Sequence, residues 1–159
     1  MRRSRRDGEP CLPQIRLAYV SRRAPHLTDD AIVDDIVLPA MAKNRRLEIT
    51  GCLWFDQRRF LQVLEGPAES VEGVFASIVA DSRHTDVDLI RRAPDEQRSF
   101  ARWAMKPVRA GEGDPIGAMV ASLSPESIPP RRRRPREAPT PPTPGALTRI
   151  VRLLAASAG

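Results

Sequence analysis

The hydrophobic and polar residues along the chain follow two periods, one typical of strands and one typical of helices. Residues 15–21 (IRLAYVS) place Ile15, Leu17 and Tyr19 on one face of an extended segment, the pattern of a strand that buries one side. The same kind of pattern predicts four more strands, at residues 49–56, 59–66, 85–93 and 100–108. The first two of these four are separated by a tight turn and are predicted to pair with each other.

Helical spacing occupies the two longer intervals between the predicted strands. Thr28 is a typical N-cap, acidic residues follow it in the first turn, and apolar residues then recur at helical spacing up to Asn44. Pro39 lies inside this pattern and is predicted to kink the helix or end it. Residues 67–83 predict a second helix, with a proline near its start.

The order β-α-β-β-α-β-β predicts an α+β fold, a ferredoxin-like sheet with two helices packed on one face. Residues 51–55 (GCLWF) are apolar on both faces, so the second face of the sheet is predicted to be covered as well. Residues 116–123 and 146–156 are the candidates. The latter segment can cap the sheet, pair with a second chain or bind a partner, since it carries an apolar helical stripe: Leu147, Ile150, Val151 and Leu154.

The net charge of +6 lies in the ends of the chain, because residues 15–107 carry 14 basic and 14 acidic side chains. Ten of the 16 prolines lie between Pro107 and Pro144, in a Pro- and Arg-rich stretch typical of an extended linker. The sequence therefore predicts five regions: a disordered basic N-terminus (1–13), a folded domain (14–108), a cap helix (109–127), a Pro/Arg-rich linker (128–145) and an amphipathic C-terminal helix (146–157).

Several classes of protein are disfavoured by what the sequence lacks. Two cysteines, Cys11 and Cys52, are too few for a disulfide framework and lack metal-ligand spacing, which indicates a reduced, cytoplasmic protein. No apolar run is long enough for a membrane span, and no apolar stretch follows the basic N-terminus as in a signal peptide. A metal cluster, a Gly-rich phosphate loop and a serine elbow are also missing, so we do not expect an enzyme.

Polar and aromatic residues stand at positions where the pattern predicts a core. Residues 60–67 (FLQVLEGP) put Gln62 between Phe60 and Leu64 on one face of a strand. A buried amide must be hydrogen-bonded, so Gln62 implies either a polar neighbour or the edge of a ligand. Other residues share this character, although each taken singly also fits an ordinary core or capping role: Tyr19, Asn44, Trp103 and Met105.

Five short segments together resemble the BLUF family, the blue-light sensors that use FAD. They read LAYVS, KNRRLEITGCL, FLQVLEGP, DSRHTDV and FARWAM, in the order and spacing of that family over residues 15–107. The resemblance implies a ferredoxin-like domain that binds FAD non-covalently and responds to blue light.

The resemblance also implies roles for three residues around the flavin ring. Tyr19 matches the tyrosine that gives an electron and a proton to the excited flavin. Gln62 matches the glutamine whose amide rearranges and changes its hydrogen bonds to flavin N5 and O4. Asn44 matches an asparagine that binds the pyrimidine end of the ring.

Further matches concern the rest of the cofactor and the output. Arg83 and His84 match positions near the ribityl and phosphate side of FAD. Trp103 and Met105 match a pair on the last strand that relays the switch. Two departures from the family pattern are Lys43, where a second Asn or another polar residue is common, and Pro39 inside the first helix.

Beyond residue 108 the resemblance ends, and a short stand-alone sensor is expected to signal by associating with another protein or with itself. The arginine run at residues 131–134 can instead bind nucleic acid or an acidic partner, or serve as a solvated linker. The alternative function is a light-independent adaptor on the same fold, acting through this basic tail.

Overall fold

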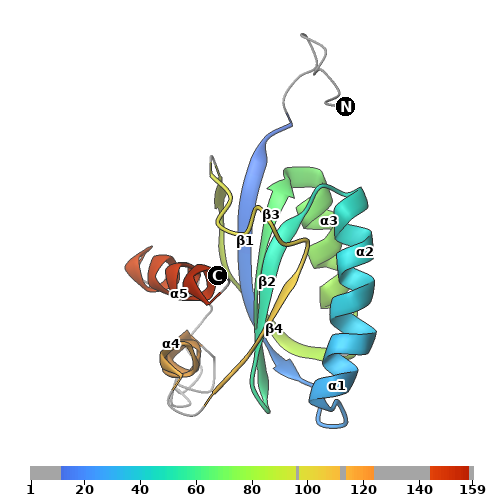
Figure 1. Ribbon diagram of the computed structural model, residues 1–159, viewed down its shortest axis with the longest axis vertical. Coiled ribbons are helices and arrows are strands. Elements are labelled where there is room, and N and C mark those ends of the chain that lie inside the picture. The colour runs from blue at the N-terminus through green and yellow to red at the C-terminus, as the bar shows by residue number, and fades with distance from the viewer. Residues whose placement is uncertain (1–11, 96, 112–113, 124–143, 158–159) are drawn as a thin grey trace, which may run out of the picture.

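The computed structural model describes residues 12–95, 97–111, 114–123 and 144–157, arranged around a five-stranded sheet (Figure 1). The strands are β1 (Gln14–Arg23), β2 (Thr50–Phe55), β3 (Arg59–Pro67), β4 (His84–Pro94) and β5 (Lys106–Arg109). Their order in the sheet is β4-β1-β3-β2-β5, with β5 parallel to β2 and the other neighbours antiparallel. This arrangement confirms the predicted ferredoxin-like α+β fold.

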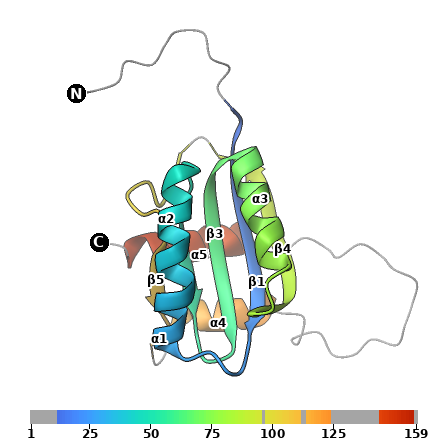
Figure 2. The same ribbon diagram turned by 90° about the vertical axis from the view of Figure 1, so that its right-hand side faces the viewer.

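One face of the sheet is covered by α1 (Asp29–Ile32), η1 (Val33–Val37), α2 (Leu38–Arg46) and α3 (Ala68–Val79). Figure 2 shows α2 and α3 lying side by side over this face, as the sequence predicts. Thr28 is confirmed as the N-cap of α1, because its hydroxyl accepts the backbone N–H of Ala31 at 3.1 Å. The second predicted helix is shorter than expected, and His84 begins β4.

Pro39 does not end the first helix: the backbone widens into the π-turn η1 directly before it, and α2 continues to Arg46. A proline has no N–H for the carbonyl four residues earlier, so the carbonyl of Asp35 lacks its α-helical donor. That carbonyl accepts a hydrogen bond from Arg83 Nη1 at 2.7 Å. The helix thus continues past Pro39 and offers a backbone acceptor to a residue far along the chain.

The opposite face of the sheet is covered by α4 (Pro115–Leu123) and α5 (Pro144–Ala156) (Figure 1). Trp54 on β2 donates its indole N–H to Asp114 Oδ2 at 2.8 Å, and its ring lies next to Gly117. The apolar stripe of α5 is buried in the same hydrophobic cluster: Leu147, Ile150, Val151 and Leu154. Of the three roles left open for this segment, the structure therefore places it as a cap on the sheet.

None of the helices within the described ranges combines the length and the hydrophobicity that crossing a membrane requires. The basic N-terminus up to residue 11 and the arginine run at residues 131–134 lie outside the described residues.

The predicted last strand is wrong in its first half, because residues 97–105 form turns and β5 begins at Lys106. The N–H of Trp103 donates to the carbonyl of Phe100 at 2.9 Å, which closes a turn where a strand was expected. Phe100 and Met105 are buried on opposite faces of the sheet. Trp103 is 37% exposed, with the Lys106 ammonium 4.9 Å from its ring centre, so its predicted core position is wrong.

Candidate functional site

A pocket of about 200 Å³ lies on the face of the sheet that carries α2 and α3. Its wall includes η1, α2, α3 and the turn before β4, and β3 contributes to its floor. Asn44, Gln62, Arg83 and His84, which sequence reasoning singled out separately, all line this pocket. Long-range folding therefore gathers residues from three distant segments around one cavity.

Tyr19 and Gln62 form a directly opposed cross-strand pair, on β1 and β3. Alternation puts both side chains on the helix-covered face, and the Tyr19 hydroxyl donates to Gln62 Oε1. Burial, and to a lesser degree the carboxylate of Asp81, hold the pKa of Tyr19 well above its ordinary range. The phenol therefore keeps its proton and presents it to the Gln62 amide.

The nitrogen end of the Gln62 amide has a weak partner. Its Nε2 donates to the thioether sulfur of Met105 at 3.4 Å, and sulfur is a poor acceptor compared with an oxygen. A primary amide has two N–H donors, and Gln62 lines the pocket, so donor capacity remains for a ligand there. The same contact links the pocket floor to the segment that enters β5.

Asn44 is buried at the C-terminal end of α2, and its Nδ2 donates to the carbonyl of Ala104 at 2.8 Å. Its side-chain oxygen has no hydrogen-bond partner among the described residues and is available on the pocket side. The left-handed residue that follows α2 is Glu48, with φ of 56°, so Asn44 is not the C-cap that its position in the sequence also allowed. Both amides that line the pocket thus bind consecutive residues of the 104–105 segment.

Arg83 joins the two walls of the pocket. Its guanidinium binds the carboxylate of Asp81, with Nη2 2.6 Å from Oδ2, and donates to the carbonyl of Asp35 in η1. The hydrogen bonds between the two side chains lower the pKa of Asp81 and raise that of Arg83, so both stay charged. The sequence analysis assigned no role to Asp81, although an aspartate two residues before an arginine in a predicted turn could have indicated this ion pair.

His84 is buried next to Phe60, and its Nδ1 lies 3.0 Å from the Ser21 hydroxyl. Burial lowers the pKa of His84 to about 4, with Asp81 opposing that effect and Arg83 adding to it, so the imidazole is neutral at neutral pH. Ser21 was also missed from sequence, although it stands two residues after Tyr19 on the same face of β1.

We expect the folded protein to lose stability as the pH falls from about 6.5 to 4. The pKa of His84 is lower in the folded than in the unfolded chain, so the unfolded chain binds the extra proton first, at a cost of about 3 kcal/mol. Asp81 acts at lower pH. Its pKa is lowered in the folded chain, so the stability that it contributes is lost mainly as the pH falls below its ordinary value of 3.8. Urea unfolding at each pH should show a flatter profile for His84→Gln. The exposed His26, changed to Gln, should leave the profile as it is.

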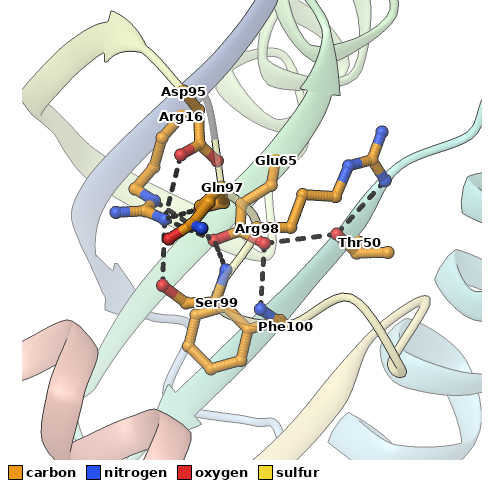
Figure 3. A network of polar contacts seen from close by, with 8 residues as sticks. All are labelled: Arg16, Thr50, Glu65, Asp95, Gln97, Arg98, Ser99 and Phe100. Atoms are coloured by element: carbon orange, nitrogen blue, oxygen red, sulfur yellow. Dashed lines mark hydrogen bonds and ion pairs between the residues drawn. The ribbon is translucent and has the colours of Figure 1, made fainter.

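On the other face of β3, Glu65 organises the turns that lead to Trp103 (Figure 3). Its carboxylate has no exposed surface and pairs with Arg16 at 3.0 Å. It also accepts the backbone N–H groups of Ser99 at 2.8 Å and Phe100 at 3.0 Å, and the Thr50 hydroxyl at 3.2 Å. Glu65 is a charged residue in an otherwise mostly apolar strand, and this pattern could have indicated a buried ion pair. The sequence analysis did not predict that role.

Comparison with known proteins places most of the described sheet within one family. A family model described as "BLUF: Sensors of blue-light using FAD" matches residues 14–106. Photoactivated adenylate cyclase subunit beta of Euglena longa is 37% identical over 71 residues, which cover 44% of this chain and 8% of that protein. The blue light- and temperature-regulated antirepressor BluF of Escherichia coli (strain K12) is 35% identical over 96 residues, covering 57% of this chain and 24% of that protein.

Among solved structures, the dark-state structure of BlrB, described as a BLUF protein, superposes with a TM-score of 0.70. It is 27% identical to this chain, and the match covers 91% of this chain and 97% of BlrB. The likeness to BlrB thus extends over nearly the whole length of both proteins, whereas this chain spans only a small part of the two curated relatives.

Proposed function

The chain belongs to the BLUF family of blue-light sensors that use FAD, and we propose that its pocket between α2 and α3 holds the flavin ring beside Tyr19 and Gln62. The observation that carries this assignment is the buried pair itself. A phenol that keeps its proton donates to an amide at the floor of a pocket, and among the described residues the nitrogen of that amide meets only a thioether. Such an amide is incompletely satisfied by the protein and suits the polar edge of a heterocycle.

The remaining lining fits a flavin. Asn44 and Gln62 offer amide groups that can both donate and accept, which matches a ring edge with alternating N–H and C=O groups. Lys43 also lines the pocket and forms no ion pair among the described residues, so it is the cation available for the phosphates of FAD. The guanidinium of Arg83 is instead committed to Asp81 and Asp35. Heat release of the bound flavin followed by chromatography distinguishes FAD from FMN.

In the proposed photocycle the bound flavin supplies light absorption and an excited state that accepts an electron. Tyr19 provides that electron, and its phenolic proton leaves along the hydrogen bond to Gln62 Oε1. Both return to Tyr19 later in the cycle, while the Gln62 amide adopts a new arrangement. Because one amide carries a donor end and an acceptor end, rearranging it changes its hydrogen bonds without moving the backbone.

The output is proposed to start at the 104–105 segment. Gln62 contacts Met105, and Asn44 contacts Ala104, so a rearranged amide alters contacts next to the exposed Trp103. A small change of this kind needs a two-state element to act on, and the turns before β5 are placed to be that element.

We propose that the chain is a sensor and not an enzyme, signalling to an effector protein or to a second copy of itself. The family model that matches residues 14–106 describes sensors of blue light, which supports the sensor function. Pro39 and Lys43, the two departures from the family pattern, both line the pocket, and α2 continues past Pro39 as part of its wall.

The first experiment is an absorption spectrum of the purified protein in the dark, during blue light and after it. We expect a flavin spectrum with a small red shift that reverses in the dark. Protein that remains colourless after incubation with FAD would contradict the sensor function.

Removing the Arg83 contact between the two pocket walls should weaken flavin binding. A lysine in Arg83→Lys keeps the charge but cannot bind the Asp81 carboxylate and the Asp35 carbonyl with one planar group. We expect FAD to bind about fivefold to tenfold more weakly, equivalent to roughly 1 kcal/mol. Titration of apoprotein, followed by quenching of flavin fluorescence, measures this.

The control is Arg92→Lys, because Arg92 forms an ion pair with Glu72 on the protein surface, away from the pocket. Equal affinities of the two variants for FAD would show that the contacts of Arg83 with Asp81 and Asp35 do not contribute to flavin binding.

A further inference from the structure

A basic groove of about 350 Å³ lies between the C-terminal end of α2 and the turns that precede β5. Arginines supply most of the charge of its lining, namely Arg45, Arg98 and Arg102, while Glu48 is the acidic residue there among those described. The exposed indole of Trp103 forms part of the wall. The groove therefore combines positive charge with an aromatic surface, a combination common where proteins bind partners.

The arginines of the basic groove form no ion pair within the described part of the chain. Arg98 donates to neutral oxygens, those of the Thr50 hydroxyl at 3.3 Å and the Gln14 amide at 2.8 Å. Arg45 and Arg102 are exposed and form no ion pair with a described carboxylate. The three guanidinium groups are therefore available to attract carboxylates from outside.

The basic groove and the flavin pocket are linked through the segment 104–105. Residues 101–104 line the groove, and Asn44 and Gln62, which line the pocket, donate to Ala104 and Met105. A change in the Gln62 amide therefore acts on the side chain of Met105, two residues after Trp103.

We propose that the basic groove docks an acidic segment of a partner protein, with its carboxylates on Arg45 and Arg102 and an apolar side chain against Trp103. Illumination changes the affinity for this segment, and this light dependence rests on the proposed function. The existence of the groove and its positive charge are independent of the proposed function.

Charge complementarity selects this occupant over two others. The tail of the chain is a poor match, because residues 124–143 carry five arginines and two glutamates. Nucleic acid is disfavoured because residues 15–107 are neutral overall and because Glu48 stands in the lining, where a phosphate chain would meet repulsion.

The test uses the full chain with bound flavin and a fluorescein-labelled peptide of six glutamates around two central leucines. Fluorescence anisotropy at 0.15 M salt, a condition that screens distant charges, measures peptide affinity in the dark and in blue light. We expect Arg45→Glu/Arg102→Glu to bind at least about tenfold more weakly than the wild type. Arg149→Glu, a charge reversal at an exposed position on α5, should bind within about twofold of it.

A second measurement reports directly on the groove. Nitrogen-15 spectra resolve the indole N–H groups of the two tryptophans, and peptide should shift the signal of Trp103. The indole of Trp54 is buried and bonded to Asp114, so its signal should stay in place. Retention of the dark flavin spectrum shows that the double variant is folded.

The outcomes separate the two proposals. Equal peptide affinity in the wild type and the double variant overturns the docking site, and so does tighter groove-dependent binding of a labelled oligothymidine. In protein that shows the red shift, we expect light to change the affinity about fivefold or more, and an unchanged affinity overturns the coupling. Groove-dependent binding by protein without a red shift overturns the photoreceptor function and leaves the docking site standing.

Discussion

In the Gln62→Leu variant we expect flavin binding to persist and the light-induced red shift to disappear. Leucine is close to glutamine in size, and Gln62 is 5% exposed between the apolar neighbours Phe60 and Leu64, so the pocket should keep its shape. What is lost is the amide that accepts from Tyr19 and donates to Met105. Without a rearranging amide, excitation of the flavin leaves no altered hydrogen bonds behind.

The measurement is a light-minus-dark difference spectrum at equal flavin occupancy. Gln57→Leu is the matched control, because Gln57 is exposed in the turn between β2 and β3 and lies outside the pocket. Tyr19→Phe should also abolish the shift, because it removes the hydroxyl that donates to Gln62. A red shift of wild-type size in Gln62→Leu would refute the assigned role of this residue.

The largest loss of stability is expected from Glu65→Ala. The substitution leaves Arg16 without its carboxylate partner at that position. Two backbone N–H groups, the partly buried one of Ser99 and the buried one of Phe100, lose their acceptor (Figure 3). Breaking a buried, fully bonded ion pair from one side costs about 3–5 kcal/mol. We therefore expect the free energy of unfolding in urea to fall by about that amount.

Glu72→Ala provides the control, because Glu72 also pairs with an arginine but its side chain is 48% exposed. Its loss should cost within about 1 kcal/mol. Hydrogen exchange adds a local readout, since the amides of Ser99 and Phe100 should lose protection in Glu65→Ala even below the unfolding transition. Similar unfolding free energies for the two variants would show that the Glu65 network contributes little to stability.

The alternation of residues in the sequence was sufficient to predict which side chains of a strand share a face of the sheet. Alternation grouped Tyr19 with Leu17 on β1 and separated Gln62 from Glu65 on β3, and the structure shows that the face of Tyr19 and Gln62 is the one that carries the helices. A side chain's direction on a strand is set by its own position, so this information is local. The order of strands and helices then predicted the ferredoxin-like topology, because few connections of that order are allowed.

Only the tertiary structure decided which distant residues meet. Pro39 frees the carbonyl of Asp35, yet its partner Arg83 lies 48 positions away and on another element. Trp103 was predicted to be buried and is exposed, because its N–H bonds to the carbonyl of Phe100 and closes a turn before β5 begins, while its carbonyl accepts the N–H of Gly51 on β2.

The sequence by itself thus determined the order of the elements, the alternation of side chains along the strands and the buried amide that needed a partner, although not every boundary. It left open whether α5 caps the sheet, what neutralises Glu65 and which side of the 101–105 segment faces solvent. These depend on contacts between segments far apart in the chain, whose free energies are decided by packing and by the loss of water from specific pairs. Local patterns in the sequence indicate which side chains are buried, and the tertiary structure determines which residues they pack against.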